Sequence, residues 1–106
     1  MNTLNKLKKI KIRGIFSDNL AFRQNADDLF DYANLLPERK IIFDFTGITS
    51  MSRSFAHQYG IKKKECTKKI IETGKSDDIN RMFELVKKHR EKKPLIDVEN
   101  LEVLVI

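Results

Sequence analysis

The sequence predicts an α/β fold in which a small mixed β-sheet is covered by about three helices. Three observations point to this fold: short apolar runs alternate with stretches of helical periodicity, turn residues separate them, and the connections are short. The elements follow the order βαβαβαβ, which is typical of helices layered on a sheet. We expect one domain over residues 1–106, with a core at about 7–92 and a C-terminal edge strand at 93–106.

The composition limits the class of protein. A chain of 106 residues, 41% apolar and 34% charged, is long enough to bury a core without disulfides or metals. The single cysteine, Cys66, has no partner for an internal bridge, which favours a reducing, cytoplasmic compartment. No apolar run approaches the roughly 20 residues of a membrane helix. The sequence therefore predicts a cytoplasmic protein with no membrane span, no cofactor and no metal.

The N-terminal segment is basic and predicts the first strand. The first sixteen residues contain five cations and no acid, which superficially resembles a transit peptide. However, Ile10, Ile12 and Phe16 fall at a period of two, whereas a transit peptide is amphipathic at helical spacing. We therefore expect a strand over 7–16 with one face on the core and a charged face outside.

A helix should follow the turn at 17–19. Its apolar residues recur at i, i+3, i+4 and i+7, and the chain leaves the helical region before Pro37. The stripe consists of Ala26, Leu29, Phe30 and Ala33, extended by Phe22 and Leu36.

The most apolar strand is expected at 41–45. It is apolar on both faces except for Asp44, which is typical of a central strand covered on both sides. Thr46 and Gly47 end it, and Asp44 is interpreted as an acceptor for N–H groups of that turn, with a role as a site residue as the alternative. A helix from about Arg53 to Glu65 follows and should bury Phe55, Ala56 and Tyr59, with Ser50, Ser52 and Ser54 as candidate caps.

Two further strands and one helix complete the prediction. The run 69–73 is a short strand bounded by Gly74. Ser76 should cap a helix that has Asp77 and Asp78 in its first turn and that Pro94 stops. The apolar stripe of this helix consists of Ile79, Met82, Phe83 and Val86. The last strand, 101–106, is expected at a sheet edge or paired with another chain, which would give a homodimer.

The central strand and the turn after it carry a family resemblance. Asp44-Phe45-Thr46-Gly47-Ile48, followed by Ser52-Arg53-Ser54-Phe55-Ala56, resembles the STAS-like domain family of unknown function, whose relatives are the sulfate-transporter and anti-sigma-factor-antagonist (STAS) domains. The segment 20–26 is similar to the approach to the family's first helix. The resemblance covers about residues 7–92.

The resemblance implies a regulatory protein–protein interaction module rather than an enzyme. The expected partner is a protein of the anti-sigma type, an ATPase or kinase, docked through Ser50–Tyr59. In the antagonists, a serine at the start of this helix is phosphorylated; here that place holds Arg53, and the neighbouring serines are the candidate phosphorylation sites. The predicted partner-binding residues are Ser52, Arg53, Ser54 and His57, with Ser52 and Ser54 as the phosphorylation sites.

The residues at the start of this helix allow two interpretations. Arg53 with the two serines would offer a planar fork of donors to a phosphate or carboxylate beside a positive helix end. Alternatively, the serines only cap the helix and Arg53 is solvated.

The net charge of +6 and the pI near 9.5 keep nucleic acid as an alternative partner. The basic runs 62–64, 68–69 and 87–93 would form the phosphate contacts. Few aromatic residues interleave them, and no nucleic-acid-binding motif is present.

Enzymatic chemistry is the third reading. His57 and His89 have no visible catalytic partner at a known spacing, and a pocket that brings His57 beside Asp44 or another carboxylate would favour an enzyme. The fragment Gly74-Lys75-Ser76 is interpreted as a turn and a cap, because Lys69 stands where a phosphate-binding loop needs its first glycine. Cys66 is expected to be an inert thiol, or one activated by neighbouring lysines.

Overall fold

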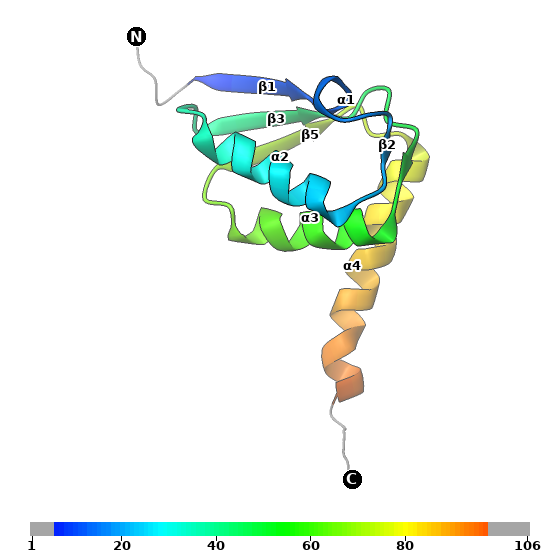
Figure 1. The fold of residues 1–106 in the computed structure, drawn as a ribbon. Helices are drawn as coiled ribbons and strands as arrows, with labels where there is room; N and C mark the ends of the chain where they lie inside the picture. The colour runs from blue at the N-terminus through cyan, green and yellow to red at the C-terminus, as the bar shows by residue number, and fades with distance from the viewer. Residues whose placement is uncertain (1–5, 98–106) are drawn as a thin grey trace.

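The structure, a computed structural model, describes residues 6–97 and confirms the α/β class (Figure 1). This part of the chain forms four helices and five strands. They are β1 (Leu7–Lys11), α1 (Ile12–Ile15), β2 (Asn19–Leu20), α2 (Arg23–Leu35), β3 (Lys40–Asp44), β4 (Ser50–Met51), α3 (Arg53–Glu65), β5 (Lys69–Thr73) and α4 (Asp77–Asp97), and β4 follows β3 without a helix between them. Among these residues every strand pair is parallel, whereas a mixed sheet was expected.

The main sheet has three strands in the order β1-β3-β5. In its register Lys9 lies opposite Ile42, and Ile42 lies opposite Ile71. Both crossovers step in the same direction along the sheet, and right-handed crossovers then place their helices on the same side. Figure 1 shows α2 and α3 together beneath the sheet.

The core lies between this inner face and the helices. Ile41 and Phe43 of β3 are fully buried against α2 and α3. The ring of Phe30 meets the rings of Phe43 and Tyr59 edge-on, with centroids 5.3 and 5.2 Å away. The predicted stripes are confirmed: the buried residues of α2 are Ala26, Leu29, Phe30 and Ala33, and those of α3 are Phe55, Ala56 and Tyr59.

The expectation that β3 is covered on both sides is wrong for the described part of the chain. No helix of residues 6–97 lies over the other face, where Ile42 and Ile71 are half-buried and Leu7 is 51% exposed. The sequence of β3 is apolar on both faces, so it could not reveal the direction of the two crossovers, which leaves this face bare.

Two predictions near the N-terminus are corrected. The first strand ends at Lys11, and the chain then forms the one-turn helix α1, although Ile12 is buried as the pattern required. Phe22 does not extend the stripe of α2, because it precedes the helix and is 70% exposed. The two-residue strands β2 and β4 were missed, since two residues are too few to show a period.

The last helix is longer than predicted. α4 continues through Pro94 to Asp97, although a proline inside a helix removes one hydrogen bond and crowds the preceding turn. The predicted C-terminal strand is therefore helical over 93–97, and its core at 101–106 lies outside the described residues. None of the helices described is long and apolar enough to cross a membrane.

Candidate functional site

The start of α3 is held by one cap and two buried side chains. Ser52 Oγ accepts a hydrogen bond from the N–H of Phe55 at 3.0 Å, as the sequence predicted. Phe55 and Ala56 are fully buried and fix the inner face of the helix. The outer face of the same turns carries exposed Arg53, Ser54 and His57. Three of the four predicted binding residues therefore face solvent.

The small β2–β4 pair fixes the turn that leads into α3. The N–H of Thr49 donates to the carbonyl of Asp18 at 2.8 Å, and the N–H of Ser52 donates to the carbonyl of Leu20 at 2.9 Å. Ser50 Oγ also donates to Asn19 Oδ1 at 2.7 Å. These bonds join segments that lie about 30 residues apart, and they hold the turn in one conformation.

A shallow pocket of about 310 Å³ opens at this helix start. Arg53, Ser54 and His57 line it together with Arg23 of α2 and Val86 of α4. Among the residues whose side chains the structure describes, two arginines line the pocket and no acidic residue does. Because guanidinium groups bind carboxylate and phosphate in a bidentate geometry, the pocket is suited to an anionic group.

Arg23 belongs to the site, and the sequence did not predict it. Its Nη2 donates to Gln58 Oε1 at 3.0 Å, and Gln58 Nε2 donates in turn to Asp27 Oδ1 at 2.8 Å. This chain of bonds joins α2 to α3 and orients the guanidinium. The only signal in the sequence was a cation in the first turn of a helix, which is ordinarily a solvated residue.

The two candidate phosphorylation sites differ in their surroundings. Ser54 is exposed and lines the pocket, whereas Ser52 is half-buried and its hydroxyl is engaged in the cap. The hydroxyl of Ser54 is therefore the more accessible of the two.

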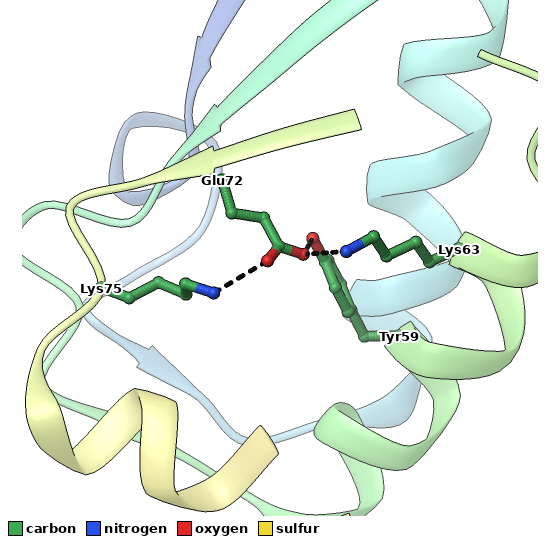
Figure 2. Close-up of polar contacts among 4 residues, drawn as sticks. All are labelled: Tyr59, Lys63, Glu72 and Lys75. Carbon is green, nitrogen blue, oxygen red and sulfur yellow. Dashed lines mark hydrogen bonds and ion pairs between the residues drawn. The ribbon is translucent and has the colours of Figure 1, made fainter. Parts of the chain in front are cut away.

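A second polar cluster lies between β5 and α3 (Figure 2). Glu72 Oε2 accepts hydrogen bonds from the hydroxyl of Tyr59 at 2.5 Å and from Lys63 at 3.0 Å, and Lys75 donates to Glu72 Oε1 at 2.8 Å. Burial raises the pKa of Glu72, but the bonds from Lys75, Tyr59 and Lys63 outweigh it and leave the pKa below its ordinary value. Burial and the charge of Glu72 raise the pKa of Tyr59 well above 10.0.

This cluster lines a groove of about 530 Å³ between α3 and α4. Phe83 forms part of the groove, and Lys75 Nζ lies 5.7 Å from the centre of its ring. Phe83 also packs against Tyr59 with ring centroids 5.0 Å apart. The described partners of Glu72 come from α3 and from the turn after β5, so the cluster joins β5 to the helix layer.

Asp44 has the structural role that was predicted. Its Oδ1 accepts from the N–H of Thr46 at 3.0 Å and from the Thr46 hydroxyl at 2.6 Å, and these bonds lower the pKa of Asp44. The fragment after β5 is a turn and a cap, as expected: Gly74 has a φ of +72°, and Ser76 Oγ accepts from the N–H of Ile79 at 3.3 Å.

The other candidates stay apart. His57 and Asp44 line different pockets, so the structure does not bring these two residues together. Cys66 is half-buried, with its sulfur 3.7 Å from Asn34 Oδ1. Among the side chains that the structure describes, no group of three metal-binding residues is close enough to hold an ion. The side chain of His89 lies outside the described part of the structure.

Comparisons with protein-family models, curated proteins and solved structures find no match to this chain. The STAS-like assignment therefore remains a prediction from the residues that carry the resemblance.

Proposed function

We propose that this chain is a non-enzymatic regulatory module that docks a protein partner through the turn and first turns of α3. The observation that carries the proposal is the pocket in which Arg23, Arg53, Ser54 and His57 meet. The partner would present a carboxylate or a phosphorylated group, which the two guanidinium groups would bind. The resemblance to anti-sigma-factor antagonists adds an ATPase or kinase as the class of partner.

The position of Ser54 supports regulation of this binding by phosphorylation. Phosphate on Ser54 would place about two negative charges in a pocket that otherwise holds two arginines. The arginines would then bind the chain's own phosphate, and the partner's anionic group would be displaced. A kinase partner that phosphorylates Ser54 would thus dissociate its own complex with this chain.

The experiment begins with the immobilised full chain and proteins from its native cells. The captured partner is purified, and its affinity is measured by calorimetry for the wild type, Arg53→Glu and Arg39→Glu. Arg39 is an exposed arginine before β3, at the opposite end of that strand from the pocket, and its substitution makes the same change in charge. We expect Arg53→Glu to weaken binding by about tenfold or more, since a charge-assisted bond becomes a repulsion.

The control variant should stay within about twofold of the wild type. Equal affinities for the wild type and Arg53→Glu would contradict the proposal, and so would an equal loss in both variants. Mass spectrometry after incubation with the partner and ATP would test the phosphorylation, which we expect at Ser54.

The alternative of nucleic-acid binding receives less support. Several of the lysines on which it depends are used within the fold: Lys62 lies 4.0 Å from Asp27 Oδ1, Lys63 pairs with Glu72, and Lys68 donates to main-chain carbonyls. These cations are less available for the phosphate contacts that dominate nucleic-acid affinity.

A further inference from the structure

The face of the β1–β3–β5 sheet that points away from α2 and α3, here termed the outer face, is bare among the described residues. Leu7, Ile42 and Ile71 share this face, because alternate residues of a strand point to the same side. Leu7 is 51% exposed, and the two isoleucines are half-buried. Ile42 and Ile71 lie opposite each other and form a short apolar strip across β3 and β5. On β1, Leu7 lies diagonally from Ile42, and Lys9 is the residue directly opposite it.

A bare face is unusual for a sheet of this kind. Parallel sheets are almost always covered on both sides, and their strands then read as continuous apolar runs. The pairs Ile41-Ile42 and Ile70-Ile71 are such runs, with one isoleucine of each pair on the inner face and one on the outer face. β3 and β5 therefore have the composition of strands in a three-layered protein, whereas the described residues supply two layers.

The charges around the strip indicate what the third layer is. Lys9, Lys11, Lys40 and Lys69 share the outer face and are exposed. Asp44 is the one acid on this face, and its Oδ2 lies 3.6 Å from Lys9 Nζ. An apolar centre with a charged rim is the usual anatomy of a protein interface, and this rim is basic.

We propose that the outer face binds an amphipathic helix of a partner protein, with an apolar stripe flanked by acidic residues. Three strands spaced about 4.8 Å apart match the width of one helix, about 10 Å across. The helix would cover the isoleucines, and its acidic flanks would meet the four lysines. This surface lies on the other side of the sheet from the pocket at α3, so the two partners would not compete.

Charge argues for this occupant over a second copy of the chain, which would bring four more lysines against the first four. Nucleic acid fits the rim but not the apolar centre, which has no aromatic residue on which bases would stack. The described last helix, α4, extends away from the sheet on the helix side (Figure 1) and does not reach the outer face.

The test uses a labelled synthetic helix of about 18 residues, with a leucine stripe flanked by glutamates, and a second peptide with lysines in place of the glutamates. Fluorescence anisotropy at about 0.15 M salt gives the affinities. We expect the acidic peptide to bind and the basic peptide to bind at least about tenfold more weakly. Nuclear magnetic resonance shifts should fall on Leu7, Ile42 and Ile71, and not on Ser54 or His57.

Two double variants with equal net charge separate this face from general attraction. Lys40→Glu with Lys69→Glu should reduce binding of the acidic peptide about tenfold or more, whereas Lys64→Glu with Lys88→Glu, on exposed positions of the helices, should leave it within about twofold. Leu7→Ser should reduce it about fivefold through lost apolar contact. Circular dichroism checks that each variant is folded.

Four results would overturn the proposal. Two concern the peptide: no binding at about 1 mM, and an equal loss of affinity in both double variants. The other two point to another occupant: duplex DNA that displaces the peptide, and a dimer of the chain that dissociates when Lys40 and Lys69 are both replaced by glutamate. Because Arg53→Glu leaves this surface intact, failure here and failure of the proposed function are distinguishable.

Discussion

Glu72 occupies a position of β5 that faces the helices, next to Ile70 on the same face, where an apolar residue would be expected. Three donors compensate the carboxylate there, two of them charged. The cost of leaving a buried charge without partners is larger than the gain from a satisfied one. Removing donors should therefore be more harmful than removing the charge.

The lowered pKa of Glu72 predicts a pH-dependent stability. Its folded-state pKa lies below its ordinary value of about 4.5, so the ionised group stabilises the fold above that pH, and the contribution is lost as the pH falls through the folded pKa. Glu72→Gln should reduce the free energy of unfolding by about 1–3 kcal/mol at pH 7, with a smaller difference from the wild type near pH 3. Urea unfolding at several pH values measures this, with Glu65→Gln, an exposed carboxylate, as control. A constant difference across that range would contradict the prediction.

Gly74 permits the close approach of the turn after β5 to the turn after β3. Its φ is +72°, and a Cβ atom there would lie 2.8 Å from Asp44 Oδ1 and closer still to Thr46 Oγ1. We expect Gly74→Ala to lower the free energy of unfolding by about 2 kcal/mol or more, because backbone strain and a clash add. Gly14→Ala is the matched control: it lies in α1, its Cβ would meet nothing nearer than 4.0 Å, and the change should be neutral or stabilising. Chemical denaturation of both variants decides between these outcomes.

The residues of the candidate site were predictable only in part. Ser52 as a cap and Arg53 and Ser54 as exposed neighbours follow from local rules about helix starts. Arg23 and Glu72 do not, because their partners lie 35 and up to 13 residues away in the chain. A glutamate in a strand of isoleucines was the available signal for the second cluster.

At the scale of elements, a lysine closes the end of α2. Lys68, just before β5, donates from Nζ to the carbonyl of Ala33 at 2.9 Å and to that of Leu36. The last carbonyls of a helix have no partner within it, and a cation suits the negative end of the helix dipole. The lysine thus replaces the glycine cap that this helix lacks.

Lys68→Met keeps most of the side-chain volume and removes the donor. We expect a loss of about 1–2 kcal/mol in the free energy of unfolding and faster amide hydrogen exchange in the last turn of α2. Lys69→Met, an exposed neighbour, should change neither by a measurable amount. Equal effects of the two substitutions would show that the hydrogen bonds from Lys68 do not stabilise the end of α2.

Elements with strong local signals were predicted to the residue. The bounds of α3 and β5 agree with the sequence analysis, because a serine cap, an apolar stripe and a following turn mark them. The sequence predicted that α4 ends at Pro94, whereas the helix continues to Asp97. The short strands β2 and β4 are created by long-range main-chain bonds rather than by local propensity.

At the scale of the whole molecule, the class of fold followed from the alternation of elements, but the layering did not. Whether helices cover one face or both depends on the direction of successive crossovers. No single strand or helix encodes that direction. The bare outer face is the result, and it is a property of the topology rather than of any residue.

The parallel arrangement has a consequence for how the chain folds as it is made. Leu7 pairs with Lys40, and Lys40 with Lys69, so every native strand contact must wait for on the order of 30 further residues. During translation β1 emerges well before it has a neighbour. Lysines at three of its five positions then protect it against pairing with other nascent chains.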